Sequence, residues 1–517
     1  MRLDHISESW DLIVVGGGIT GAGVLREAVR MGLRVLLVEK NDFAWGTSSR
    51  SSKLVHGGLR YLRQGRVHLT RESVRHRQRL LNEAPGLVEP IGFMMPVYKN
   101  RGPGRWSLRA GLSVYDLMAG NRNHVCYDAE TFCEMVPGFN AFGLECGFRF
   151  MDAQVDDARL VLRLINESVQ KGASALNYTM VTGIRRNADE SVSGVRLRDE
   201  ETGAERTVSA PAVINATGSW AETLHSSPAK DLHLRPLRGS HLMLPVWRLP
   251  VYQAVTLIHP DDGRPLFIIP WEGALMLGTT DIDHRSGLDG EIVMDRHEAQ
   301  YMIECLRAYF PGRDLRLRDC ISSYSGIRPV LSNKDRPPSQ ESREHVVWKD
   351  RGLVTVTGGK LTTFRRLAED ALKAASPWLP GGAEPDMSEP VFDPVAAPPK
   401  NRGILDSGLR RRLAGRYGSD AARIIRNADK KDLCFIPGTF TLWAELPVLA
   451  ESEQIRHLTD LMLRRVRVGI LAPRGGRRYL DRIEALCRPV LDWDESRWKT
   501  EKSMYMDYWD HAHSVPL

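Results

Sequence analysis

The sequence predicts an α/β protein with a discontinuous nucleotide-binding domain, an inserted antiparallel β-sheet domain and a helical C-terminal domain. Three observations predict this fold class. A glycine-rich strand–turn–helix unit begins near residue 12, two more strand–turn segments with small residues follow far downstream, and a Pro-rich segment precedes a helical remainder. At 517 residues the chain is also long for one hydrophobic core, so two or three domains are expected.

The composition is that of a soluble globular protein, with 42% hydrophobic and 26% charged residues. There is no run of about eighteen apolar residues, and the acidic first residues do not resemble a secretion signal, so a cytoplasmic protein is expected. The seven cysteines form no CxxC pair, which predicts reduced thiols and no metal site. The formal charge of +7 suits anionic partners such as phosphorylated metabolites or acidic lipid surfaces. Nucleic acid is not expected as a partner, because no nucleic-acid-binding signature occurs.

The first element is a β-α-β unit. Residues 12–15 are an apolar run that predicts a strand, and residues 19–31 carry apolar side chains at helical spacing. Gly32 stops this helix, and residues 35–38 form a second apolar strand that ends at Glu39. A strand, a crossover helix and a second strand of these lengths indicate the start of a Rossmann-like parallel sheet.

The glycines of this unit have the G-x-G-x-x-G spacing of a dinucleotide-binding turn. Gly16 allows the tight turn, Gly18 lets a pyrophosphate approach the backbone, and Gly21 lets the helix pack closely on the strand. Phosphates would bind the exposed N–H groups at the helix N-terminus. Glu39 can accept hydrogen bonds from a ribose diol and would repel a 2′-phosphate, which argues against NADP. The motif alone does not separate FAD from NAD.

The next segment, residues 46–62, combines glycines, hydroxyl side chains and positive charges. Small residues such as Thr47, Ser48, Ser51 and Gly57 permit close backbone approach, and their hydroxyls can donate hydrogen bonds to phosphate or flavin oxygens. Interleaved leucines and a valine argue against a flexible linker. Because FAD needs contacts well beyond the first β-α-β unit, this segment favours FAD.

Two later segments add to the same domain. Residues 212–218 contain a short apolar strand and a turn of small residues. Residues 353–362 contain a strand, a Gly-Gly turn and the start of a helix near Thr362. A helix N-terminus with Lys360 beside it would stabilise negative charge on a reduced flavin.

The expected domain boundaries follow from these separations. The nucleotide-binding domain is predicted at residues 1–90, 150–230 and 345–375. Residues 91–149 and 231–344 form the predicted substrate-binding domain, which contains several short β-rich runs between turn residues. A Pro-rich linker at 376–403 is predicted to precede the helical C-terminal domain at 404–517.

Eight motifs follow one another in the chain. They are GGGITG (16–21), TSSRSSKLVHGGLRYL (47–62), VDDARLV (155–161), NATGSW (215–220), RGSH (238–241), IPW…GTTD (269–281), YSGIRP (324–329) and GGKLTT (358–363). In these motifs and in their order the chain resembles the FAD-dependent glycerol-3-phosphate dehydrogenases, the membrane-associated type that reduces quinone. The resemblance is looser beyond residue 400.

The resemblance implies FAD as the cofactor and oxidation of sn-glycerol 3-phosphate to dihydroxyacetone phosphate, with electrons passed to a membrane quinone. It also implies a homodimer attached peripherally to the inner face of the cell membrane. The basic amphipathic segment 100–120 is of a kind that can lie on an anionic bilayer. Two alternatives stay open: a glycerol-3-phosphate oxidase that uses oxygen, and a non-catalytic flavin-binding sensor docked on membranes.

The resemblance also implies where FAD binds. Thr47 and Ser48 would meet the pyrophosphate, and residues 53–58 would meet the flavin ring. The full set of expected cofactor contacts is Gly16, Gly17, Gly18, Ile19, Thr20, Gly21, Glu39, Lys40, Thr47, Ser48, Ser51, Lys53, Leu54, His56, Gly57, Gly58, Val181, Ala216, Thr217, Gly218, Gly359, Lys360, Leu361 and Thr362.

The implied reaction needs a cationic clamp for phosphate, a base near the hydroxyl and positive charge near the flavin. Arg60 and Arg328 are the clamp candidates, because a guanidinium binds phosphate oxygens in bidentate fashion, and Tyr61 would share their cavity. His241 is the first choice for the base, since the ordinary pKa of histidine lies near neutral pH. A histidine at the edge of the core, satisfied by backbone, is the alternative. Lys360 would orient the substrate or stabilise the reduced flavin.

Overall fold

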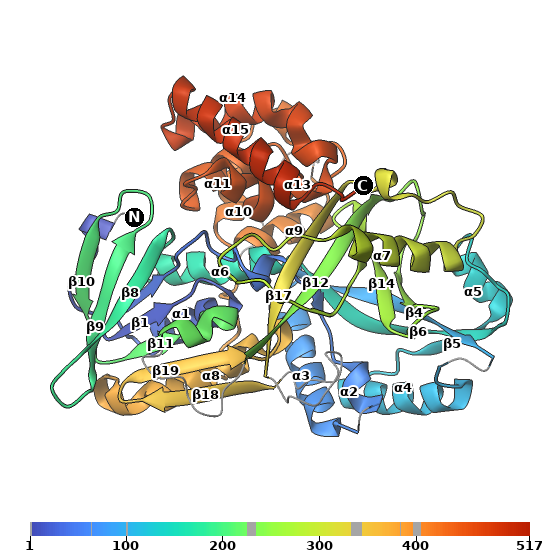
Figure 1. The fold of residues 1–517 in the computed structure, drawn as a ribbon, viewed down its shortest axis with the longest axis horizontal. Coiled ribbons are helices and arrows are strands. Elements are labelled where there is room, and N and C mark those ends of the chain that lie inside the picture. The colour runs from blue at the N-terminus through green and yellow to red at the C-terminus, as the bar shows by residue number, and fades with distance from the viewer. Residues whose placement is uncertain are drawn as a thin grey trace.

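The structure is a computed structural model. It describes residues 3–63, 65–99, 102–224, 234–331, 344–382, 384–395 and 405–517, and the side chains of Arg60 and Arg63 lie outside this description. The described residues form an α/β part, a large mixed sheet, and a helical C-terminal part that lies over the junction of the other two (Figure 1). The predicted fold class is confirmed.

A six-stranded sheet forms the centre of the α/β part. Its strand order is β18 (His345–Asp350), β19 (Leu353–Gly358), β11 (Val213–Asn215), β1 (Leu12–Val15), β2 (Val35–Val38) and β7 (Ser174–Leu176). Neighbouring strands are parallel except β18 and β19, and Ile13 of β1 pairs with both Val213 and Leu36. The sheet is therefore assembled from three stretches that lie far apart in the sequence.

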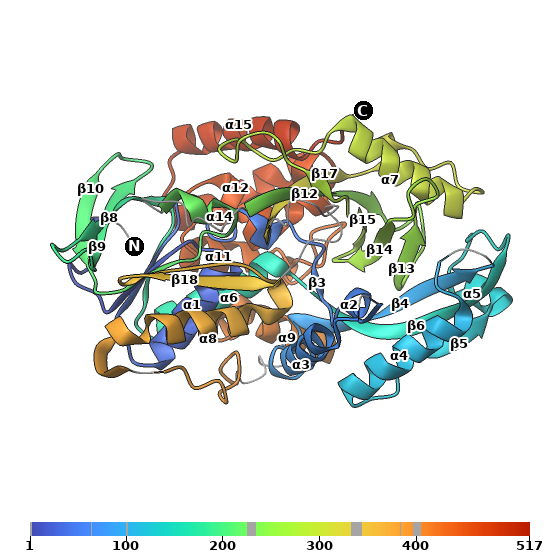
Figure 2. The same ribbon diagram turned by 60° about the horizontal axis from the view of Figure 1, so that its bottom comes forward.

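Both faces of this sheet are covered, which explains why its strands are continuous apolar runs. Leu12 and Val14 pack against three helices, α1 (Ile19–Arg30), α6 (Asp157–Gln170) and α8 (Phe364–Ala375). Ile13 and Val15 face the other way, toward a three-stranded antiparallel sheet. That sheet consists of β8 (Thr179–Arg186), β9 (Val192–Asp199) and β10 (Glu205–Ser209), and it forms one end of the molecule (Figure 2).

The second part is a ten-stranded mixed sheet. Its strands are β3 (Leu54–Val55), β4 (Val88–Tyr98), β5 (Val125–Asp128), β6 (Leu144–Val155), β12 (Leu234–Pro245), β13 (Ala254–Ile258), β14 (Pro265–Trp271), β15 (Ala274–Gly278), β16 (Ile282–Asp283) and β17 (Ser322–Leu331). α5 (Ala129–Met135) and α7 (Arg296–Tyr309) cover one face. β12 pairs with β17 along most of its length, which sets His241 opposite Tyr324.

The C-terminal part is helical, as predicted. Its elements are α9 (Ser407–Tyr417), α10 (Asp420–Arg426), α11 (Glu445–Ser452), α12 (Leu458–Asp460), the π-helical turn Leu461–Arg465, α13 (Val468–Leu471), α14 (Leu480–Leu491) and α15 (Glu495–Ala512). These helices share one hydrophobic core with the second face of the large sheet, including Met243 and Met276. Of the predicted Pro-rich linker, residue 383 and residues 396–403 lie outside the described residues.

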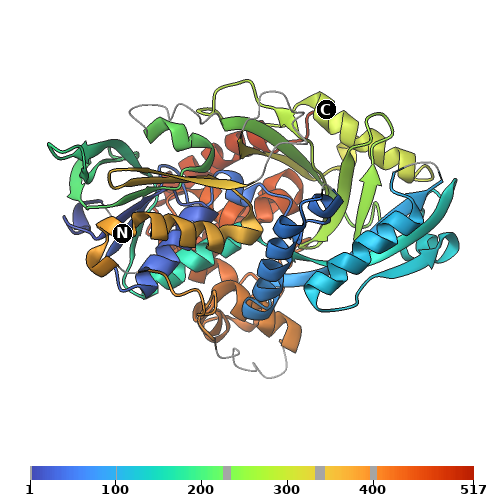
Figure 3. The same cartoon turned by 90° about the horizontal axis from the view of Figure 1, so that it is seen from below.

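Three further helices lie on the underside of the molecule (Figure 3). They are α2 (Leu59–Arg63), α3 (Val67–Glu83) and α4 (Arg105–Ala119), and all three contact one another. Among the helices of the described residues, none combines the length and the apolar character that a membrane span requires.

Candidate functional site

The carboxyl ends of β1, β2, β11 and β19 meet at one edge of the six-stranded sheet, where α/β proteins bind their ligands. Gly16 follows β1, and Ala216 follows β11. A Cβ atom on Gly16 would lie 2.7 Å from the carbonyl oxygen of Ala216, and the φ of Gly16 is +110°. Only glycine fits this close approach. The glycine turn after β1 and the predicted segment 212–218 are thus brought together.

The N-terminus of α1 opens at this edge. Its N-cap, Gly18, makes no side-chain cap hydrogen bond, and a Cβ atom there would meet only Ser48 within 4 Å. The Ile19 N–H donates to Ser48 Oγ at 2.9 Å. Exposed backbone donors and a hydroxyl at a helix N-terminus suit a pyrophosphate. Gly16, Gly17, Thr20 and Gly21 belong to the same turn and first helical residues.

Glu39 ends β2 at the same edge and is half-buried. Its carboxylate accepts hydrogen bonds from the backbone N–H groups of Gly17 at 2.7 Å and Asn41 at 2.9 Å. Burial raises the pKa of Glu39, and the two backbone donors oppose that shift. The acid is thus oriented beside the glycine turn, as a ribose-binding acid must be. The N-terminus of α1, the Ser48 hydroxyl and the Glu39 carboxylate together fit a dinucleotide cofactor.

The remaining expected cofactor residues lie on neighbouring backbone. Thr179 N–H, at the start of the strand that carries Val181, donates to the Glu39 carbonyl at 2.7 Å, and Lys40 Nζ lies 5.3 Å from the centre of the Trp220 ring. Further expected residues occupy the turns after β11 and β19 and the segment before α2, namely Thr217, Gly218, Gly359, Leu361, Thr362, Leu54, His56, Gly57 and Gly58. Thr362 Oγ1 donates to the His56 carbonyl at 3.4 Å, which joins two of these segments.

The segment 46–58 runs from the α1 N-terminus to the large sheet. It contains the 3₁₀ turn η2 (Thr47–Ser49) and β3. The Thr47 hydroxyl donates to the carbonyl of Ile327 on β17. The expected pyrophosphate segment is therefore also bonded to the strand that carries Arg328.

Ser51 and Lys53 differ from the expectation that their side chains face the cofactor. The backbone N–H and the hydroxyl of Ser51 both donate to Asp157, at 3.0 and 2.7 Å. Lys53 is fully buried, and its ammonium donates to both oxygens of Asp157 at 3.0 Å and to the Ser49 carbonyl at 2.9 Å. Burial lowers the pKa of Lys53 to about 8, while Asp157 opposes that shift. Both side chains therefore bind the carboxylate at the start of α6 and do not face a ligand.

His241 lies beneath the site and is only 1% exposed. Its Nε2 is 2.9 Å from the hydroxyl of Ser52, and its ring stacks on Tyr324 with centroids 4.7 Å apart. Within the described residues, the buried Nδ1 has no hydrogen-bond partner. Burial holds the pKa of His241 well below its usual value, and the positive charges of Arg328 and Lys53 lower it further. The imidazole is therefore neutral at physiological pH, and its partner is a side chain rather than backbone.

Ser52 is a site residue that the sequence patterns did not single out. It is half-buried, hence more accessible than His241, and its hydroxyl is the group through which His241 meets the segment 46–58. Ser52 belongs to a run of four serines and one arginine, and nothing in that run indicates which hydroxyl contacts a histidine 189 residues away.

Arg328 projects from β17 with 22% of its side chain exposed. Its guanidinium donates to Asp281 at 2.9 Å, to the Thr280 carbonyl at 3.2 Å and to the Thr279 hydroxyl at 2.8 Å. Three acceptors on one side fix the orientation of the planar group. The ion pair with Asp281 leaves part of the Arg328 side chain accessible.

Lys360 and Tyr61 lie against each other. The Lys360 ammonium lies 3.8 Å from the centre of the Tyr61 ring and 3.0 Å from the hydroxyl of Ser73 on α3. β17 and β19 are in contact, so Arg328 and Lys360 stand on adjacent elements. The backbone of Arg60 lies in α2 next to Tyr61, and its side chain is outside the described residues.

Comparisons with known proteins agree with this geometry. The FAD dependent oxidoreductase family matches residues 11–365, and the C-terminal domain of alpha-glycerophosphate oxidase matches residues 360–498. An aerobic glycerol-3-phosphate dehydrogenase of Staphylococcus aureus (strain USA300) is 31% identical, and the alignment covers 95% of this chain and 92% of the relative.

Two solved structures share the fold. The glycerol-3-phosphate dehydrogenase from Bacillus halodurans complexed with FAD has a TM-score of 0.75 and 26% identity, and covers 98% of this chain and 95% of its own. An L-alpha-glycerophosphate oxidase from Mycoplasma pneumoniae with FAD bound has a TM-score of 0.58 and 18% identity over 71% of this chain and 95% of its own. The match extends through the C-terminal part, where sequence motifs alone are sparse. This chain therefore belongs to the FAD-dependent glycerol-3-phosphate dehydrogenase and oxidase family, and its cofactor is FAD.

Proposed function

We propose that the protein oxidises sn-glycerol 3-phosphate to dihydroxyacetone phosphate and passes the electrons to a membrane quinone. The observation that carries the proposal is a pair of cations beside the FAD-binding edge: Arg328 lies on β17, and Lys360 lies two residues after β19, the strand that β17 contacts. An anionic substrate needs such a pair, and relatives that align over nearly the whole chain are named aerobic glycerol-3-phosphate dehydrogenases.

Arg328 is proposed to bind the substrate phosphate. Its guanidinium is already held by Asp281, Thr280 and Thr279, so little side-chain freedom is lost when a phosphate binds. Lys360 is held by the Tyr61 ring and by Ser73, which leaves the ammonium a fixed donor at the same site. Arg60 is a further proposed phosphate ligand on the basis of its motif alone.

Bound FAD supplies the acceptor for the hydride that leaves C2 of the substrate. The chain itself must take the hydroxyl proton. We propose that this proton passes to the Ser52 oxygen while the Ser52 proton passes to Nε2 of His241. The neutral imidazole can accept it, and the charges of Arg328 and Lys53 then favour its release again.

The proposed acceptor is a quinone, reached from the membrane surface. The outward face of α4 carries exposed Trp106 and Leu117, and the guanidinium groups of Arg105 and Arg109 lie 5.9 and 5.8 Å from the Trp106 ring centre. The one acid of α4, Asp116, is buried against His124. An apolar and basic face suits an anionic bilayer. The homodimer is proposed from the family resemblance alone.

The test is reduction of the purified holoenzyme without oxygen. Adding sn-glycerol 3-phosphate should bleach the flavin absorbance promptly, and a protein that stays yellow would contradict the substrate assignment and favour the sensor. Turnover with a soluble quinone is then compared with peroxide formation in air. Peroxide formed as fast as quinone is reduced would favour the oxidase.

A further inference from the structure

We propose that the helical C-terminal part holds the FAD-contacting segment 46–58 in position, and that Arg467 is the positioning residue through which it does so. The inference rests on the proposed course of FAD along this segment. It gives the C-terminal part a role in cofactor binding.

Asp157 accepts the hydrogen bonds that hold the segment 46–58 in position. It stands in the first turn of α6, is fully buried, and accepts hydrogen bonds from Ser51 and Lys53 of the segment. The Arg467 guanidinium donates to the same carboxylate. Two cations and three neutral donors, the third being the Ala158 N–H, thus share one acid, an arrangement that leaves a buried charge compensated.

Arg467 reaches the segment directly as well. Its Nη1 donates to the carbonyl of Ser49 at 3.2 Å, an oxygen that also accepts from Lys53 at 2.9 Å. Its Nε donates to Asp156 at 3.1 Å. The residue lies between the π-helical turn and α13 with φ of +58°, an uncommon backbone conformation for a non-glycine residue, here fixed by the buried contacts of the side chain.

The C-terminal part also fixes the chain on either side of Ser49. Arg464 and Arg465 both donate to Asp42, shortly before the segment, and lower the pKa of that buried acid to about 2 although burial alone would raise it. Tyr508 of α15 accepts from Arg50 at 3.2 Å. The C-terminal part therefore contacts the chain before the segment at Asp42 and within it at Ser49 and Arg50.

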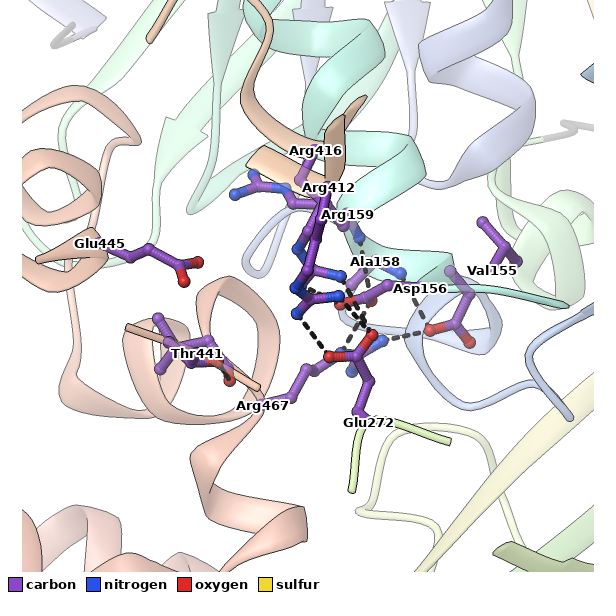
Figure 4. A network of polar contacts seen from close by, with 12 residues as sticks. Val155, Asp156, Ala158, Arg159, Glu272, Arg412, Arg416, Thr441, Glu445 and Arg467 are labelled. Atoms are coloured by element: carbon purple, nitrogen blue, oxygen red, sulfur yellow. Dashed lines mark hydrogen bonds and ion pairs between the residues drawn. The ribbon is translucent and has the colours of Figure 1, made fainter. Parts of the chain in front are cut away.

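Arg416 offers a matched comparison within the same cluster (Figure 4). It comes from α9, is as buried as Arg467, and donates to Asp156 at 2.7 Å. Its other ion pair is with Glu272, in the turn between β14 and β15, at 3.5 Å. It shares the acid Asp156 with Arg467, but among the described residues its ion pairs are with Asp156 and Glu272 and not with the segment 46–58.

If either arginine is replaced, every acid that it paired with still has one other cation beside it. Without Arg467, Asp157 keeps Lys53 and Asp156 keeps Arg416; without Arg416, Asp156 keeps Arg467 and Glu272 keeps Arg412. Both substitutions should therefore destabilise the fold by similar amounts. Only the loss of Arg467 also removes one donor from the Ser49 carbonyl and one from Asp157, the acid that anchors Ser51.

The experiment compares Arg467→Met with Arg416→Met as purified holoenzymes. FAD affinity is measured by fluorescence titration after the flavin is removed, and thermal unfolding is recorded in parallel. We expect Arg467→Met to weaken FAD binding about tenfold, the effect of losing charged hydrogen bonds, and Arg416→Met to leave it within about twofold. Equal FAD affinities in the two variants would overturn the inference.

If Arg467→Met does not fold, a second pair of variants that keep a positive charge at each position tests the same inference. In Arg467→Lys the ammonium can satisfy one acid but cannot also reach the Ser49 carbonyl, so FAD binding should weaken relative to Arg416→Lys. Identical FAD affinity in these two would overturn the inference. Failure of the wild type to bleach with substrate would instead contradict the proposed function, because FAD affinity is measured without substrate.

Discussion

The hydroxyl of Ser52 lies 2.9 Å from Nε2 of His241, and this histidine is covered by Tyr324 on one face of its ring. Tyr324 in turn donates to the carbonyl of Ser51 at 3.0 Å, and the Lys53 ammonium lies 4.7 Å from the centre of the Tyr324 ring. Three consecutive residues therefore fix the position and the surroundings of one imidazole.

Ser52→Ala should lower the turnover number about a hundredfold, the usual contribution of a positioned acid–base group, with FAD content unchanged. The reason is that His241 then has no side chain to relay the proton. Single-turnover bleaching of the flavin without oxygen measures this step. Ser51→Ala provides a contrast, because its hydroxyl contacts Asp157 and not His241: it should weaken FAD retention and leave the bleaching rate of the FAD-loaded protein near that of the wild type. Equal turnover in the wild type and Ser52→Ala would contradict the relay.

Arg328→Lys should raise KM for sn-glycerol 3-phosphate about tenfold or more. A lysine cannot hold Asp281, Thr279 and a phosphate at once, whereas the guanidinium has donors for all three. Steady-state kinetics with a soluble quinone measure the change. The exposed Arg316–Asp314 pair provides the control, and Arg316→Lys should leave KM as it is. An unchanged KM in Arg328→Lys would place the phosphate elsewhere.

Sequence patterns were enough to predict the α/β fold and the assembly of its nucleotide-binding sheet from segments far apart in the chain. These features depend on local spacing or on the carboxyl ends of parallel strands, which meet by topology. The direction of side chains within the segment 46–58 depends instead on distant partners. The side chains of Ser51 and Lys53 turn to Asp157, which lies 106 and 104 residues away in the sequence, and the Ser49 carbonyl accepts from Arg467, 418 residues away. No local pattern encodes such separations.

The same reasoning applies to His241. Its motif predicts a polar residue on a strand near the site, but burial decides its chemistry. The stacked Tyr324 and the buried Lys53 come from other segments, and their contribution to its depressed pKa is visible only once they are packed together. Ser52 was missed for that reason.

The free energy of unfolding should fall as pH drops from about 6.5 to 4, in part because of His513. Burial, helped by Arg50, lowers the pKa of His513 to about 4. The unfolded chain therefore binds a proton in this range that the folded chain does not, which costs up to about 3 kcal/mol. Urea unfolding of His513→Asn, whose amide can still donate to the Ser323 carbonyl, should show a smaller loss between pH 7 and 5.

His457 should change the stability of the fold with pH in the opposite direction to His513. Burial lowers its pKa, but the hydrogen bond to Glu501 and nearby acids outweigh this and raise it. Its stabilising contribution is complete below about pH 6.5 and is lost as pH rises through the higher pKa of the folded state. His457→Asn should therefore cost more stability at pH 6 than at pH 9. Equal pH dependence in the two variants would contradict both assignments.

Replacement of Trp106 and Leu117 together by serine should reduce sedimentation of the protein with vesicles that contain anionic lipid. These side chains are 72% and 82% exposed on the outward face of α4, so their loss removes apolar area available to a bilayer without disturbing the core. Trp247, on the turn after β12, is also 72% exposed, so Trp247→Ser provides a control of equal exposure. Reduction of a soluble quinone should be unaffected, because α4 does not carry the proposed substrate residues, whereas reduction of a quinone dissolved in the vesicles should slow. Undiminished vesicle binding by the double variant would exclude α4 as the membrane-facing helix, and loss of both activities would mean that the substitutions disturb the site itself.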